Sequence, residues 1–203
     1  MRSERDAAAV RLVGMTKGVA PAAVEAAIAA GLRDFGENFV QEAQERIEVL
    51  DAAASEATWH FIGHLQTNKV PAALSLFDII HSVDSLRLAQ QLSHRAHTRL
   101  RVLLEVNVAG EASKFGFAPA GVADAVSAIA SLPNLDLAGL MTVAPAHADA
   151  DAARPVFRAL RELADANGLT ELSMGMTDDF EVAIEEGATL VRIGRAIFGE
   201  RPS

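Results

Sequence analysis

The sequence predicts an α/β protein whose parallel strands close into a single (β/α)8 barrel of the TIM type. Short apolar runs alternate with longer stretches of helical periodicity along all 203 residues, which is the pattern of βα units around a parallel sheet. Eight such runs are present, the number that closes a barrel. Neither a linker nor a shift in composition divides the chain, so we expect one domain over residues 1–203. An open doubly wound sheet is the alternative architecture.

The predicted strands are short runs dominated by apolar residues. They lie at residues 11–16, 33–38, 59–63, 78–83, 101–108, 137–143, 171–176 and 190–194. Because helical segments separate them, we expect the strands to be parallel, with all their carboxyl ends at one end of the barrel.

The segments between the strands show apolar residues at helical spacing. The residues that set this spacing are Val24, Ala27 and Ile28; Val40, Ala43, Ile47 and Leu50; Val122, Ala125, Val126 and Ile129; and Val156, Phe157, Leu160 and Leu163. Ser85 is the predicted N-cap of the helix that follows the fourth strand. Gly187 is the predicted C-terminus of the helix after the seventh.

Composition excludes several classes of function. The net charge of −9 argues against a surface for nucleic acid or anionic membranes, since phosphate binding needs clustered Lys and Arg. The chain has no cysteine, which excludes disulfides and thiolate catalysis, and its histidines lack metal-ligand spacing. No apolar run approaches the ~20 residues of a membrane span, and the N-terminal stretch has no signal-like apolar core. We therefore expect a soluble cytoplasmic protein without a metal site. Because no predicted helix is continuously apolar, we also expect a monomer.

Polar residues gather at the predicted carboxyl ends of the strands, where barrels carry their active groups. These residues are Lys17, Glu37, Asn38, His64, Asn107, Ser173 and Thr177. Alternation along a strand places Val13, Met15 and Lys17 on one face, and Arg192 lies within the eighth strand. Together these side chains predict one lined pocket.

Two of these residues each allow two interpretations. Lys17 is either a solvated or salt-bridged strand-end residue, or a lysine that forms a Schiff base, because burial lowers the pKa of an amine and frees its lone pair. Arg192 is either in an ion pair with Glu105 or another carboxylate, or faces an acceptor atom of a ligand. The residues alone leave both pairs of alternatives open.

Glycine-bearing turns follow the last two predicted strands. The stretches are "SMGMTDD" at residues 173–179 and "RIGRAIFG" at residues 192–199. They are either simple tight turns or a phosphate site, since barrels bind phosphate at these loops with backbone N–H groups. The hydroxyls of Ser173 and Thr177 would add donors to such a site.

Taken together, the motifs resemble the pyridoxal phosphate homeostasis proteins, a family related to the barrel domain of alanine racemase. The matching stretches are "LVGMTKGVAP", "DFGENFVQEAQERI", "WHFIGHLQTNK", "IIHSVDSLRLA", "VLLEVNVAGEASKFGF", "LAGLMTVAP" and "LSMGMTDDFEVAIEEGATLVRIGRAIFG". They occur in order over nearly the whole chain. The joint match is highly specific, although no single stretch is.

The resemblance implies an alanine racemase N-terminal-domain-like barrel that binds pyridoxal 5'-phosphate (PLP), with Lys17 as the aldimine lysine. It implies a phosphate site around Ser173, Gly175, Met176, Thr177 and Gly194, an Arg192 that faces the pyridine nitrogen, and wall positions at Asn38, His64, Asn107 and Met141. This chain departs from the family's usual pattern in having Arg195 where a small hydroxyl residue is common. It also has few residues before the first strand.

Three functions fit a lysine Schiff base in such a barrel. The first is a non-catalytic PLP carrier in intracellular PLP homeostasis, with PLP-dependent apoenzymes as its potential partners. The second is an amino-acid racemase, which needs a second base that the racemases supply as tyrosine, and this chain has no tyrosine. The third is a Schiff-base aldolase, for which no acid/base partner is evident. We expect the carrier, with no catalytic residues.

Overall fold

The computed structural model describes residues 6–145 and 149–199, and its strands form a closed barrel in the order of the sequence. The strands are β1 (Arg11–Met15), β2 (Asp34–Glu37), β3 (Thr58–Phe61), β4 (Ile79–Val83), β5 (Leu100–Glu105), β6 (Leu135–Met141), β7 (Glu171–Ser173) and β8 (Leu190–Ile193). All neighbouring pairs are parallel, and β1 pairs with β8 from Arg11↔Leu190 to Gly14↔Ile193. This closing pair confirms the predicted barrel and rules out the open sheet.

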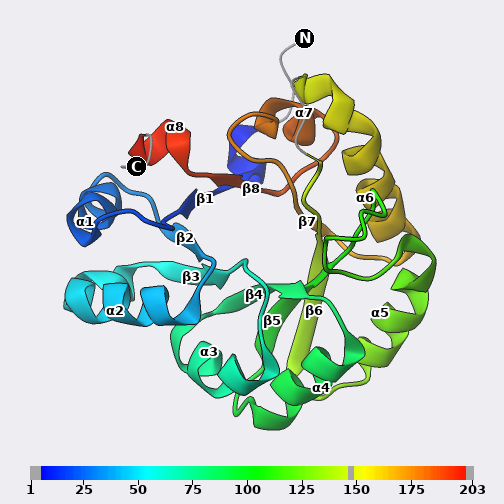
Figure 1. Cartoon of the computed structure of the whole chain (residues 1–203), viewed down its shortest axis with the longest axis horizontal. Helices are drawn as coiled ribbons and strands as arrows, with labels where there is room; N and C mark the ends of the chain where they lie inside the picture. Colours follow the sequence, from blue (N-terminus) through cyan, green and yellow to red (C-terminus); the bar gives the residue numbers. More distant parts are fainter. Residues whose placement is uncertain (1–5, 146–148, 200–203) are drawn as a thin grey trace.

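The α-helices lie outside the ring of strands (Figure 1). They are α1 (Pro21–Ala29), α2 (Val40–Leu50), α3 (Val70–Leu76), α4 (Leu86–Arg95), α5 (Val122–Ala130), α6 (Arg154–Ala166), α7 (Phe180–Glu185) and α8 (Arg195–Phe198). Each helix follows the strand of the same number, so every strand's carboxyl end leads into a βα loop at one end of the barrel. Those loops position the candidate site.

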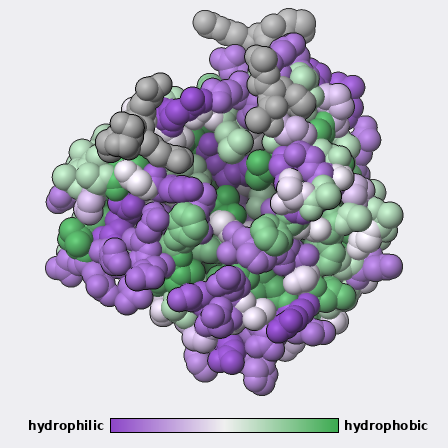
Figure 2. Space-filling model, in the orientation of Figure 1, coloured by the Kyte–Doolittle hydropathy of each residue, from purple (hydrophilic) through white to green (hydrophobic). Residues whose placement is uncertain are grey.

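The main core lies between the strands and the inner faces of the helices. It includes fully buried Val24, Phe35, Leu88, Ile129 and Phe157, which come from both layers. Ile79, Leu103 and Met141 form a second, smaller cluster. On the outside, hydrophilic residues predominate over the face in Figure 2, with smaller hydrophobic areas among them. Within the described residues, no helix combines the length and apolar character needed to cross a membrane.

Local sequence signals explain where several elements begin and end. The Ser85 hydroxyl accepts a hydrogen bond from the Leu88 amide at 3.3 Å, which confirms the predicted cap of α4. Gly187 has φ 107° two residues beyond the end of α7, as predicted for a helix end. The seventh strand is shorter than predicted, because Gly175, with φ 91°, turns the chain away from the sheet.

Candidate functional site

Lys17 lies two residues beyond the end of β1, in a turn that Gly18 completes with φ 70°. Its side chain is half-buried, and its Nζ is 5.0 Å from the centre of the Phe39 ring. Among the described residues, no hydrogen bond or ion pair engages the Lys17 amine. Within the part of the chain that the structure describes, Lys17 therefore forms no salt bridge, which was one of its two interpretations. What remains is an amine held against an aromatic face at the mouth of the barrel.

A buried ion pair holds the loop that carries Lys17. Arg46 of α2 binds the Glu37 carboxylate at 2.7 Å and donates to the Thr16 carbonyl at 2.9 Å. A further hydrogen bond joins the Arg46 guanidinium to the Val19 carbonyl. Since Thr16 and Val19 flank Lys17, one guanidinium fixes the backbone on both sides of it. We call Thr16, Val19, Glu37 and Arg46 the loop clamp.

The Glu37 carboxylate is the most constrained group of the loop clamp. It is fully buried at the end of β2, and its Oε1 also accepts from the Thr16 hydroxyl at 2.7 Å. Burial raises the pKa of Glu37, while the hydrogen bond from Thr16 and the charge of Arg46 oppose that rise. Its Oε2 is buried without a hydrogen-bond partner among the described residues. Such a group is stable only while Arg46 stays in place.

Arg192 lies inside the barrel with only 3 % of its surface exposed. Its guanidinium donates to the Ser173 hydroxyl at 2.7 Å and to the Thr142 carbonyl at 2.8 Å. Burial lowers the pKa of Arg192 to about 10, while the charges of Asp179 and Glu105 act in the other direction. Arg192 therefore stays protonated at neutral pH. Within the described residues it makes no ion pair, so the interpretation of Arg192 as the partner of Glu105 or another carboxylate is not supported.

The strand that precedes Lys17 and the strand that carries Arg192 are neighbours in the barrel, since β1 pairs with β8. Val13 is aligned with Arg192 in the β1–β8 pair. Val13 and Met15 lie on one face of β1, and Lys17 follows in the turn beyond the carboxyl end of the strand. Lys17 thus lies beyond Arg192 along the barrel axis. The pocket that would join the two residues stays a prediction.

The loops after β7 and β8, where a phosphate site is predicted, follow two strands that pair with each other. The Arg192 amide donates to the Gly175 carbonyl at 2.9 Å, and the Met176 amide donates to the Asp179 carboxylate at 2.6 Å. A Cβ atom at Gly175 would lie 2.5 Å from the Ala183 side chain, so only glycine fits this turn. Thr177 and Gly194 occupy the same two loops. Their contact with a phosphate stays a prediction.

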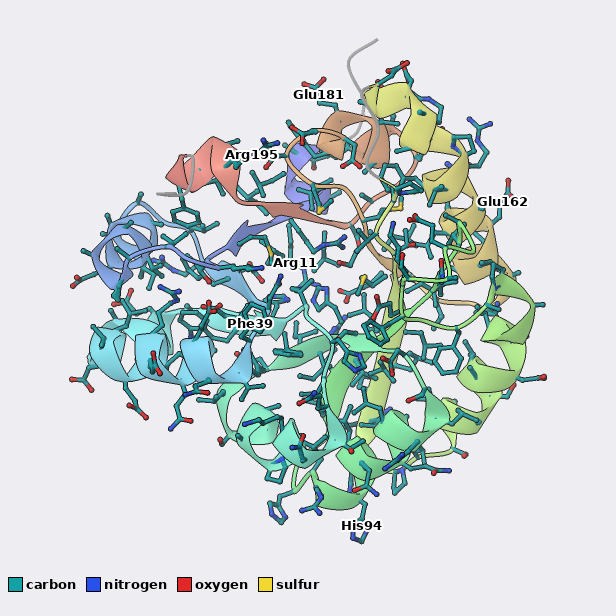
Figure 3. The ribbon with its side chains drawn as sticks, viewed as in Figure 1. Arg11, Phe39, His94, Glu162, Glu181 and Arg195 are labelled. Atoms are coloured by element: carbon teal, nitrogen blue, oxygen red, sulfur yellow. The ribbon has the colours of Figure 1, made fainter. Side chains whose placement is uncertain are left out.

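Arg195, where this chain departs from the family's usual residue, begins α8 and is exposed. Its guanidinium donates to the Asp178 carboxylate at 2.6 Å, which links the β8–α8 loop to the β7–α7 loop. Figure 3 shows Arg195 at α8 and Phe39 at the inner end of α2, on two sides of the ring of strands. The Arg195–Asp178 pair is on the surface, where an ion pair contributes little to stability.

The predicted wall residues have different environments. Asn38 has a buried side-chain oxygen without a partner among the described residues. Asn107 is engaged within its own loop, where its amide donates to the Glu111 carbonyl at 2.8 Å. His64 stacks on the Phe115 ring with 3.7 Å between ring centres, and Met141 is fully buried in the barrel. Asn38 and His64 therefore present polar groups near the mouth, whereas Asn107 shapes a loop.

Glu105 is the most strongly perturbed carboxyl group near the pocket. It ends β5, and its pKa is raised from 4.5 to about 7, first by burial and then by the charge of Asp84, while Arg192 opposes the rise. Asp84 itself is bound to the His64 ring at 2.9 Å. A carboxyl group that titrates near neutral pH lies beside the predicted cofactor site, where perturbed pKa values are common.

Sequence reasoning missed the two buried histidines of the barrel interior, His60 and His81. Both are completely buried, and their rings are joined by a hydrogen bond of 2.8 Å between His60 Nδ1 and His81 Nε2. His81 also contacts the Ser173 hydroxyl at 2.8 Å. The available signal was a histidine in the middle of each of two neighbouring apolar strands. No set of three or more His, Asp or Glu in the described chain is arranged to hold a metal ion.

Comparison with known proteins shows the family. The family model for the alanine racemase N-terminal domain matches residues 3–202. The chain is 49 % identical, over 97 % of its length and 87 % of the relative's, to the pyridoxal phosphate homeostasis protein of Pseudomonas aeruginosa. The protein of the same name from Aquifex aeolicus is 43 % identical, with 98 % and 91 % covered.

The chain belongs to the pyridoxal phosphate homeostasis protein family.

A solved structure of the same fold comes from Synechococcus elongatus. This is the protein PipY with PLP bound, which matches with a TM-score of 0.86 and 36 % identity over 97 % of this chain and 95 % of that one. The family's likeness in sequence and fold extends over both the β1 loop with Lys17 and the last two βα loops, so the predicted site lies within the matched region.

Proposed function

We propose that this protein binds pyridoxal 5'-phosphate in the mouth of its barrel and serves intracellular PLP homeostasis. The observation that carries the proposal is Lys17, an amine held against Phe39 with no ion-pair partner in the described structure. Relatives named for PLP homeostasis and the PLP-bound PipY support the choice of cofactor. The residues present fit PLP. Lys17 offers an amine for the aldehyde, the loops after β7 and β8 offer a place for the phosphate, and Arg192 offers a cation for the ring nitrogen.

In this proposal, Lys17 is the covalent anchor. Its amine would hold the cofactor, and bound PLP would supply an aldehyde that can react with an amine. The loop clamp orients the amine, because Arg46 fixes the carbonyls of Thr16 and Val19 on either side of it. Phe39 covers one side of the lysine and limits its access to water. Lys17 is not required for folding in this account, since it makes no structural ion pair.

The phosphate is proposed to lie against the loops after β7 and β8. Gly175 permits a close backbone turn there, and Met176, Thr177 and Gly194 border the same space. The Thr177 hydroxyl would donate to the phosphate. Ser173 lies deeper, and its hydroxyl contacts Arg192. Replacing Thr177 by alanine removes one charge-assisted hydrogen bond, worth roughly 1.5–3 kcal/mol, so we expect affinity for PLP to fall about tenfold or more.

Arg192 is proposed to face the pyridine nitrogen of the cofactor. Arginine is only a donor, so it pairs with an unprotonated ring nitrogen. PLP supplies an electron sink when it is bound, and a donor at the ring nitrogen weakens that property. This chain also contains no tyrosine to act as a second base. Both features favour a carrier that passes PLP to apoenzymes over a racemase.

Hydrogen exchange separates a carrier from an enzyme. The PLP-loaded protein is incubated with D- or L-alanine in heavy water, and the α-proton is followed by NMR. A carrier gives no exchange above the rate of free PLP. Exchange at about one per second or faster, lost in Lys17→Ala, would show that the protein is a catalyst and would overturn the carrier assignment.

A further inference from the structure

A chain of buried polar side chains crosses the barrel and ends at Arg192. Asp34 Oδ1 lies 2.9 Å from His60 Nε2, and His60 Nδ1 lies 2.8 Å from His81 Nε2. His81 Nδ1 lies 2.8 Å from the Ser173 hydroxyl, which accepts from Arg192 at 2.7 Å. Asp34 opens β2 and Ser173 ends β7, so this interior chain runs from the amino end of the barrel to its carboxyl end.

The hydrogens of the interior chain have one arrangement in which every group is used. Arg192 donates to Ser173, and the single hydroxyl hydrogen of Ser173 then goes to His81 Nδ1. His81 must therefore carry its proton on Nε2, where it donates to His60 Nδ1. His60 in turn carries its proton on Nε2 and donates to Asp34. Both histidines are neutral in this arrangement, and each has the same tautomer.

The opposite arrangement is less favourable. If His81 carried its proton on Nδ1, His60 would need both ring protons in order to donate to His81 and to Asp34. A second buried cation would then lie near Arg192, and the Ser173 hydroxyl hydrogen would have no partner within the chain. Burial lowers the pKa of His81 well below its ordinary value of 6.5, and positive charge nearby, on His60 when it is protonated and on Arg192, lowers it further. That direction favours the neutral form.

The far end of the interior chain is anchored by charges at the amino ends of the strands. Arg11 Nη1 lies 3.9 Å from Asp34 Oδ1, and Arg11 also pairs with Glu171. Glu171 is bound by Arg101 at 2.9 Å. Figure 3 shows Arg11 toward the centre of the ring of strands. Asp34 is thereby held as the terminal acceptor of the interior chain.

We propose that His60 and His81 are positioning residues for Arg192, which they orient through the Ser173 hydroxyl so that its guanidinium faces the ring nitrogen of PLP. The inference rests on the proposed function. Neither histidine touches the cofactor in this account. They act by keeping the lone pair of Ser173 directed at Arg192, in a site where no other side-chain acceptor in the described structure bonds to that guanidinium.

The first test needs no cofactor. ¹⁵N NMR of the histidine rings in the cofactor-free protein reports which ring nitrogen carries the proton. The interior chain predicts that both His60 and His81 are neutral and protonated on Nε2. A proton on Nδ1 of His81 would overturn the proposal, whatever the protein binds.

The second test compares His81→Leu with His81→Gln, because a glutamine amide has one acceptor and one donor and can replace both ring nitrogens. In His81→Leu we expect affinity for PLP to fall about tenfold, the scale of one lost hydrogen bond to a charged group, together with a shifted visible absorption band. His81→Gln should recover most of both. His94→Leu is the control, since His94 is exposed on the outer side of α4 (Figure 3).

The outcomes separate the two proposals. If the unaltered protein binds no PLP, the proposed function fails, while the NMR experiment still decides the hydrogen arrangement. If the protein binds PLP and a folded His81→Leu keeps the original affinity and band, the positioning role is wrong. If His81→Leu does not fold, Ser173→Ala removes only the linking hydroxyl, and an unchanged band in that variant contradicts the proposal equally.

Discussion

Charged residues at the two ends of the barrel differ in how they are paired. At the amino end, Arg11 and Arg101 both pair with Glu171 near the starts of their strands, partly in contact with solvent. At the carboxyl end, the Lys17 amine has no ion pair among the described residues, and buried oxygens of Glu37 and Asn38 have no hydrogen-bond partner there. Paired charges cost little, whereas unsatisfied buried groups are expensive. The comparison places partly exposed ion pairs at the amino end, and a buried pair beside groups left without protein partners at the carboxyl end.

The largest expected effect is at Lys17. Lys17→Ala should abolish the visible absorption of bound PLP, because no other amine is held at the same position, while the free energy of unfolding of the cofactor-free protein changes little. Absorption spectra after gel filtration measure the first effect and urea unfolding the second. Lys69→Ala is the control, since Lys69 is exposed beside α3. A Lys17→Ala protein that keeps the full visible band would remove Lys17 from the account.

The next effect comes from the loop clamp. Arg46→Met leaves the Glu37 carboxylate buried without its cation, which costs about 3–5 kcal/mol for a buried pair. Urea unfolding of the cofactor-free protein measures this loss. We also expect slower covalent capture of PLP, because the carbonyls beside Lys17 lose their common donor. A loss below 1 kcal/mol would mean that the Arg46–Glu37 pair does not hold the loop.

Glu105 should make stability depend on pH. Its pKa is raised to about 7 in the folded protein, so that as pH rises above 4.5 the unfolded chain releases this proton before the folded protein does. The stabilising effect of the bound proton is therefore complete below about pH 4.5 and is lost as pH rises through about 7. Glu105→Gln should remove this decline. Its free energy of unfolding, relative to that of the unaltered protein, should therefore be higher at about pH 8 than at about pH 5.

Unfolding of the cofactor-free protein at the two pH values tests this prediction. Glu162→Gln is the matched control, because Glu162 lies exposed on the outer side of α6 (Figure 3). The prediction fails if Glu105→Gln and Glu162→Gln show the same change in stability between the two pH values.

The smallest effect is expected at the amino end. Arg99 is 3.6 Å from Asp136, and both side chains are substantially exposed, at 69 % and 42 %. Arg99→Met should change the free energy of unfolding by less than about 1 kcal/mol, as is typical of surface ion pairs. The same substitution at Arg46 and at Arg99 thus compares the two environments directly. Equal losses would contradict the difference drawn between the barrel ends.

The architecture was largely predictable, because eight apolar runs with intervening helical periodicity carry a local signal. The helix α3 was not predicted. It spans only Val70–Leu76 and has a proline in its first turn, so it lacks the repeated apolar spacing that marks longer helices. The short helix α8 was missed for the same reason.

The candidate site was predictable in part. Lys17 and the two glycine loops could be predicted, because the active groups of a barrel lie at the carboxyl ends of its strands. The loop clamp and the interior chain could not be predicted, because they depend on contacts between distant elements. Arg46 binds Glu37 from α2, and His81 contacts Ser173, which is 92 positions away in the sequence. Alternation gives the face of each strand, but only the closed barrel brings those faces together.

Reduction with borohydride tests the central claim most directly. The protein is saturated with PLP, treated with borohydride to fix any carbon–nitrogen double bond, and digested for peptide mass mapping. The chain has three lysines, Lys17, Lys69 and Lys114, so the readout is unambiguous. The account predicts one adduct, on Lys17, that is absent when free pyridoxal replaces PLP at the same low concentration. An adduct mainly on Lys69 or Lys114, or no adduct at saturating PLP, would contradict it.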